Sequence, residues 1–99
     1  MNQIAQGDIL LIRRAELPKG AKPIKSRIIA EGEATGHNHA LVGEAQVYEV
    51  APDILWVVAE DATLTHQEHG HIAVEPGIWE VRRQREFDPF TGVARRVQD

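Results

Sequence analysis

Alternation between apolar and polar side chains dominates this chain and predicts β-strands rather than helices. Short runs of aliphatic and β-branched residues recur between turn signals made of proline, glycine and aspartate. No stretch keeps apolar residues at helical spacing over the about 11 residues that a helix prediction needs. The expected strands cover residues 8–14, 45–51, 54–64, 71–74 and 78–87, with a further strand-like run over 26–41. We therefore expect an all-β fold over residues 1–99, a small single-domain β-barrel or sandwich of roughly six to eight short strands.

The apolar run at residues 54–59 predicts a core strand. Every position in it is apolar, which is typical of a central strand covered on both faces. Pro52 and Asp53 precede the run and predict the turn that joins it to the 45–51 strand. Trp56 and Trp79 are the largest side chains in the predicted strands, so we expect them to anchor the core.

The run from residue 26 to residue 41 separates two kinds of side chain. Successive side chains on a strand point to opposite faces. One face would then carry small, mostly apolar residues, while the other carries Glu31, Glu33, Thr35, His37 and His39. Glycines at 32, 36 and 43 are expected to bend or bulge this ribbon.

Composition narrows the classes of function. The chain has 99 residues, 42% of them hydrophobic, and a net charge of −4 with neutral histidines, which is typical of a soluble globular domain and opposes a broad basic surface for nucleic acid. It has no cysteine, so any metal must bind imidazole and oxygen ligands. No apolar stretch approaches the about 20 residues of a membrane-spanning helix and no leader pattern is visible, so we expect a cytoplasmic protein without membrane contact.

All five histidines lie in two short segments, residues 36–41 and 66–72. Two histidines at positions i and i+2 of a strand share a face, with Cα atoms about 6.5–7 Å apart, so their nitrogens can converge on one ion. The spacing predicts a metal site whose ligands are His37, His39, His66 and His69, with His71 in reserve. Chance clustering and a pH-sensitive surface patch are the alternative interpretations.

The metal would be a divalent transition metal, with zinc as the first choice and iron, nickel or copper as the others. Imidazole nitrogens favour these metals over calcium and magnesium, which prefer oxygen ligands. An open coordination position would hold water and support a metal-dependent hydrolase or oxygenase acting on a small-molecule substrate. Glu33, Glu44 and Glu68 are then the candidates for a general base, with Glu44 and Glu68 preferred; the same two residues could also serve as a carboxylate ligand. A fully closed site would instead stabilise a small domain that lacks disulfides.

The histidine pattern resembles the motifs of the cupins, which are small double-sheet β-barrels. The segment "HNHALVGE" supplies His37, His39 and Glu44 at the spacing of the first cupin motif, and "GHIAVEPG" offers the glycine and the Pro-Gly turn of the second. Glu80 stands where cupins have a third metal histidine, and Ala51 stands where the first motif ends in glycine. The full chain also resembles an uncharacterised family of small bacterial and phage proteins with "EGEATGH.H" and "H.EH" segments. The cupin likeness implies a metal-binding barrel.

The C-terminal segment is basic and carries two aromatic residues. Its arginines and phenylalanines are Arg82, Arg83, Arg85, Arg95, Arg96, Phe87 and Phe90. One interpretation is a platform for single-stranded nucleic acid, in which aromatics stack on bases and arginines bind phosphates. The other, which the acidic net charge favours, is a charged edge strand that prevents edge-to-edge pairing. Exposed edges in so small a protein also predict a homo-oligomer, and a non-catalytic assembly protein is the corresponding function.

Overall fold

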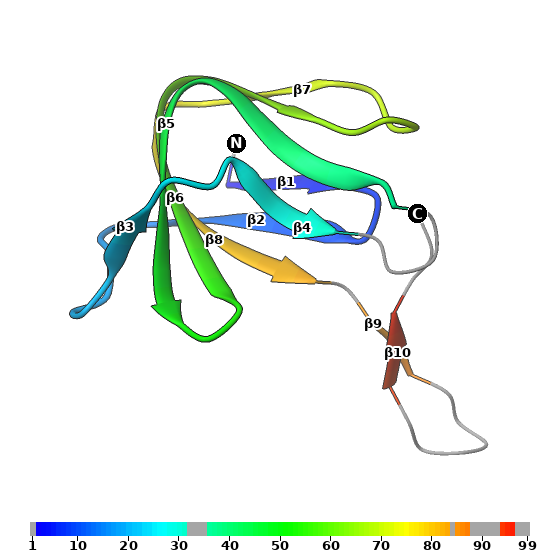
Figure 1. The fold of residues 1–99 in the computed structure, drawn as a ribbon, viewed down its shortest axis with the longest axis horizontal. Helices are drawn as coiled ribbons and strands as arrows, with labels where there is room; N and C mark the ends of the chain where they lie inside the picture. The colour runs from blue at the N-terminus through cyan, green and yellow to red at the C-terminus, as the bar shows by residue number, and fades with distance from the viewer. Residues whose placement is uncertain (1, 32–35, 84, 88–93, 97–99) are drawn as a thin grey trace.

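The protein is built from β-strands joined by short turns (Figure 1). The computed structural model describes residues 2–31, 36–83, 85–87 and 94–96. Within these ranges no helix occurs, and hence none that could span a membrane. The strands are β1 (Gln3–Gln6), β2 (Ile9–Arg14), β3 (Lys22–Ile24), β4 (Ile28–Glu31), β5 (Asn38–Ala51), β6 (Ile54–Thr65), β7 (Ile72–Val74), β8 (Gly77–Arg83), β9 (Arg85–Phe87) and β10 (Ala94–Arg96).

Eight of these strands form one antiparallel sheet. Its order is β1-β2-β8-β6-β5-β3, while β4 also pairs with β5 and β7 also pairs with β6. The long strands β5 and β6, green in Figure 1, form the hairpin on which the sheet is built. One half of this hairpin pairs with β3 and β8, and the other half pairs with β4 and β7. The two remaining strands, β9 and β10, pair with each other.

Two β-bulges set the shape of the long hairpin. Near the turn, Val50 is the extra residue of β5, and farther along Glu60 is the extra residue of β6. A bulge of this kind bends a strand and shifts which parity faces inward. In β6 the buried residues are Val57 and Ala59 before the bulge but Ala62 and Leu64 after it. Because of the bulge at Glu60, both halves of β6 bury side chains on the inner face.

The core lies on the inner face of this bent sheet. Its largest fully buried side chains are Trp79, Ile9, Leu11, Leu41 and Leu64, which come from β8, β2, β5 and β6. The indole Nε1 of Trp79 donates to the carbonyl oxygen of Glu75 at 3.0 Å, so this large side chain is buried with its polar atom satisfied. Burial of apolar side chains from strands distant in sequence holds the sheet together.

The all-β prediction is confirmed, as an eight-stranded antiparallel sheet rather than a closed barrel. Trp79 is a core residue as expected, whereas Trp56 is only half-buried. The expectation that residues 54–59 are covered on both faces holds only in part. Val57 and Ala59 are buried, whereas on the other face Val58 is half-buried and Ile54, at the start of the strand, is 46% exposed. The strand expected over 78–87 is divided into β8 and β9, which pair in different sheets.

Candidate functional site

The long hairpin brings the two histidine segments together. Beyond the Glu60 bulge the register pairs Glu44 with Asp61 and Ala40 with Thr65, and one further step places His39 opposite His66. The pattern continues past the end of the ladder, because the backbone N–H of Asn38 donates to the side-chain oxygen of Gln67 at 2.8 Å. The ends of β5 and β6 that lie farthest from the turn therefore carry the histidines side by side.

Four imidazole rings form a compact group, which we call the histidine cluster (His37, His39, His66 and His69). The ring of His66 lies at its centre, with centroids 4.4 Å from His39, 4.6 Å from His69 and 5.5 Å from His37. The rings of His39 and His69 are 6.3 Å apart and nearly parallel. His39 and His66 are buried, whereas His37 and His69 are half-buried. The cluster thus reaches from the core to the surface.

His39 contacts polar side chains from the first hairpin of the fold. Its Nδ1 atom lies 2.9 Å from Oε1 of Gln6, and its Nε2 atom lies 3.3 Å from Oδ1 of Asp8. The other carboxylate oxygen of Asp8 accepts from Arg83 at 3.1 Å, and Arg83 also donates to the carbonyl oxygen of Glu31. Gln6 and Asp8 are 3% and 1% exposed. A buried carboxylate held by a guanidinium thus faces the innermost histidine.

His66 holds the turn that follows β6. Its Nδ1 atom accepts backbone N–H groups from Glu68 at 3.0 Å and from His69 at 3.3 Å. A ring nitrogen that accepts carries no proton, so in its neutral form His66 is protonated at Nε2. This short turn places His69 against His66, where a straight strand would separate residues three apart onto opposite faces.

Of the other predicted site residues, only Glu68 lies next to the histidine cluster. Glu68 is exposed and its Oε1 lies 3.6 Å from Nδ1 of His37, at the outer side of the cluster. Glu44 is exposed on β5 and pairs in register with Asp61, near the middle of the hairpin. His71 is exposed and makes none of the ring contacts that join the four cluster residues. Glu33, the third carboxylate named, lies outside the described residues.

The rings do not stand in a coordinating arrangement. Over the part of the chain that the structure describes, no three His, Cys, Asp or Glu side chains are arranged so that they could hold a metal ion. The planes of His39, His66 and His69 meet at 11–47°, so these rings lie partly face to face. In this arrangement the cluster is a packed group of imidazoles next to a buried carboxylate.

Sequence reasoning missed Gln6 and Asp8. Both lie more than 30 residues from His39 in sequence, and only the folding of the first hairpin against the turn after β6 brings them near it. One signal was available in the sequence: Asp8 directly precedes the apolar run of β2 at a predicted strand start. A carboxylate in such a position is rarely buried unless it has charged or hydrogen-bonding partners.

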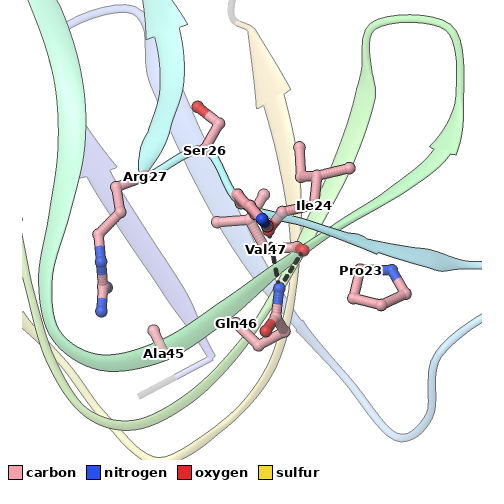
Figure 2. A pocket seen from close by; sticks show the side chains of 8 residues that line it. Pro23, Ile24, Ser26, Arg27, Ala45, Gln46 and Val47 are labelled. Carbon is pink, nitrogen blue, oxygen red and sulfur yellow. Dashed lines mark hydrogen bonds between the residues drawn. The ribbon is translucent and has the colours of Figure 1, made fainter.

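A separate hollow lies on the other half of the hairpin. It has a volume of about 410 Å³ and is lined by residues 23–27 and 45–47. Figure 2 shows that the side-chain amide of Gln46 inside it is bonded to the backbone, and its Nε2 donates to the carbonyl oxygens of Ile24 and Val47. Arg27 likewise donates to the carbonyl oxygen of Gly43. The hollow contains no residue of the histidine cluster.

The arginines of β8 make hydrogen bonds to other groups of the protein. Arg82 donates to Glu80 at 2.9 Å, and Arg83 donates to Asp8 and to the backbone of Glu31. These contacts favour the interpretation of a charge-compensated strand over a nucleic-acid platform. The side chains of Arg85, Phe87, Phe90, Arg95 and Arg96 lie outside those described.

Comparison with known proteins identifies a family but no activity. A family model described as a domain of unknown function, DUF8820, matches residues 5–84. No curated protein and no solved structure matches the chain significantly. The matched region contains the whole histidine cluster together with Gln6, Asp8 and Arg83.

Proposed function

The chain belongs to the DUF8820 family, and from the geometry of the histidine cluster we propose that it binds a divalent transition metal ion, with zinc as the first choice. The observation that carries the proposal is the convergence of four imidazoles from two separate segments, with neighbouring ring centroids 4.4–6.3 Å apart. Imidazole is a preferred ligand for zinc, copper, nickel and iron. The chain contains no cysteine, so no thiolate competes with the imidazoles as a ligand.

The spacing of the ring centres suits a shared ion. With zinc–nitrogen bonds of about 2.0–2.1 Å and tetrahedral geometry, two bound imidazoles have ring centres about 5 Å apart. The measured separations fall on both sides of this value. Rotation about the Cβ–Cγ bond turns an imidazole plane but leaves its centre almost in place. Coordination therefore requires other rings of the cluster to turn, while the backbone of the hairpin and the ring of His39, which Gln6 and Asp8 already hold, stay as they are.

Asp8 offers an oxygen ligand at a fitting distance. Two ligand atoms bound to one tetrahedral zinc ion are about 3.3 Å apart, given bonds of about 2.0–2.1 Å. Nε2 of His39 and Oδ1 of Asp8 are separated by 3.3 Å. The hydrogen bond that Arg83 donates to the other oxygen of Asp8 holds the carboxylate in this orientation. A mixed set of histidines and one aspartate is a common zinc environment.

Metal analysis of protein purified without a histidine tag tests the proposal directly. We expect wild-type protein to contain, or to take up, one zinc ion per chain in competition with a chromogenic chelator. The His69→Ala variant should bind zinc at least about tenfold more weakly, because even the loss of a residue that only hydrogen-bonds to a metal ligand has an effect of that size. His69 is the best target because it is half-buried, so its truncation removes less packing than truncation of the buried His39 or His66.

His71→Ala is the matched control. It removes the same side chain only two residues away, from an exposed position outside the cluster. It should bind zinc as wild type does, and circular dichroism should show both variants folded. The proposal is refuted if wild-type protein takes up no zinc, nickel, iron or copper. It is equally refuted if the two alanine variants bind zinc alike.

The same site could support hydrolysis by a metal-bound water, and the position of Glu68 favours this extension. Its carboxylate lies 3.6 Å from His37 at the exposed side of the cluster, where a substrate would have access. A carboxylate there could accept a proton from the water. Glu44 lies too far along β5 for this role. Comparing zinc-loaded wild type and Glu68→Gln in a hydrolase screen measures this contribution.

A further inference from the structure

Both ring nitrogens of His39 lie next to side-chain oxygens, one from an amide and the other from a carboxylate. Gln6 Oε1 lies 2.9 Å from Nδ1, and Asp8 Oδ1 lies 3.3 Å from Nε2. The His39 side chain is fully buried and Gln6 is 3% exposed. Which nitrogen carries a proton is therefore decided by protein groups rather than by bulk water.

The orientation of the Gln6 amide is fixed independently of His39. Its Nε2 group donates to the carbonyl oxygen of Leu64 at 3.0 Å and to that of Gly70 at 2.8 Å. Turning the amide over would bring its oxygen against these two carbonyl oxygens, which can only accept. Both N–H groups of the amide are thus used, and its oxygen faces His39.

An amide oxygen only accepts, so the short contact requires that Nδ1 of His39 donates. While Nδ1 keeps this proton, Nε2, the atom next to Asp8, is the one ring nitrogen that can give a lone pair to a ligand. Metal-binding histidines characteristically donate the other ring N–H to a fixed acceptor, which orients the ring and selects the coordinating nitrogen. Gln6 meets that description without touching the ion.

We infer that Gln6 is a positioning residue of the histidine cluster, which fixes His39 with its Nδ1 protonated and so makes Nε2, beside Asp8, the metal-binding nitrogen. The inference rests on the proposed metal-binding function for its effect on affinity. The protonated nitrogen itself is a property of the metal-free protein and is measured separately.

Two substitutions separate positioning from simple structural support. Gln6→Met and Gln6→Glu both lose the donors to Leu64 and Gly70, but only glutamate still offers an oxygen to Nδ1 of His39. If Gln6 matters only for stability, glutamate is the worse replacement, because a carboxylate then faces two carbonyl oxygens. If it positions His39, glutamate is the better one.

Long-range ¹H–¹⁵N correlation spectra of the metal-free protein report which ring nitrogen of His39 carries a proton. We expect a protonated Nδ1 in wild type and in Gln6→Glu, and loss of that preference in Gln6→Met. Zinc affinity should fall about 10- to 100-fold in Gln6→Met and stay close to wild type in Gln6→Glu.

Each contrary result has a separate meaning. An Nδ1 atom without a proton in wild-type protein overturns the inference on its own, even if neither variant folds. Equal loss of zinc affinity in the two variants also overturns it, because Gln6 then supports the fold alone. If wild type binds no zinc, the proposed function fails, while the spectra still show which ring nitrogen of His39 carries the proton.

Discussion

Replacing His66 separates the two roles that its ring could have. The side chain is 5% exposed, and its Nδ1 atom accepts the backbone N–H groups of Glu68 and His69. Alanine removes both this acceptor and the ring. Asparagine removes the ring but has a side-chain oxygen able to accept N–H groups two or three residues on, as it does in Asx turns. The pair of variants therefore differs mainly in whether the turn keeps its acceptor.

The structure allows the magnitude to be estimated. Each of the two backbone bonds contributes about 0.5–1.5 kcal/mol to stability. Truncation of a buried ring adds a cavity cost, about 3–5 kcal/mol for a full Phe→Ala change and less for a smaller imidazole in a polar group. We expect His66→Ala to lose about 3 kcal/mol and His66→Asn about half of that. For a domain this small, a loss of about 3 kcal/mol lowers Tm by roughly 12–24 °C.

Urea unfolding in buffer containing a chelator measures these losses without any contribution from metal. If the two variants are equally destabilised, the turn bonds are not what His66 provides, and the reasoning is refuted. A zinc titration of the folded His66→Asn variant then addresses coordination. Weak binding by a variant with an intact turn shows that zinc binding needs the His66 ring, which can act as a ligand only by giving up the proton on Nε2 or the bonds that Nδ1 accepts. Binding like that of wild type restricts His66 to holding the turn.

Two further substitutions test how the sheet is held. Burial raises the pKa of Glu80, but hydrogen bonds from Arg82 and Arg14 outweigh it and leave the pKa below its ordinary value of 4.5. The ion pairs therefore stabilise the fold above about pH 4.5 and lose their effect as the pH falls through the lowered value. In urea unfolding, Glu80→Gln should lower the free energy of unfolding by about 0.5–1 kcal/mol at pH 7 and leave it unchanged at pH 2. An equal loss at both pH values would contradict this explanation. Gly43 has a φ of 94°, and a Cβ there would overlap a backbone oxygen of β6. Gly43→Ala should lower the free energy of unfolding by about 2–4 kcal/mol. Gly20→Ala is the control, with an expected loss of about 1 kcal/mol, because Gly20 also has positive φ but has open space where the Cβ would stand. Similar losses in the two variants would show that the overlap at Gly43 is relieved.

Much of the fold could be predicted because it depends on local patterns. The Pro52–Asp53 turn, the strand β6 and the short β7 were readable in the sequence. The run expected over 26–41 and the separate strand expected over 45–51 are instead divided into β4 and the single long strand β5, which pair with each other. Counting outward from that turn even places His39 opposite His66, since Ala51 pairs with Ile54 and the two bulges cancel. The meeting of the histidine segments was thus implied by one turn.

The less local features could not be read in this way. A run of apolar residues does not reveal whether a second layer covers it, and in β6 solvent lies on the outer face at Ile54. Gln6 and Asp8 reach His39 only through contacts between strands far apart in the chain. Polar side chains of this kind are typical of surface positions, because their burial without partners is costly, and the sequence does not reveal their partners.

The paired bulges of the long hairpin have a consequence for how its length can change. Val50 and Glu60 each add one residue to opposite strands, so each offsets the shift that the other introduces. Deleting either extra residue alone restores regular pairing at that point and leaves the pairs on both sides of it unchanged, so His39 still faces His66. Deleting a paired residue of the ladder instead shifts the rest of that strand by one position, which sends its side chains to the opposite face. Single deletions in this hairpin are therefore tolerated at Val50 and Glu60 and not at the paired positions between them.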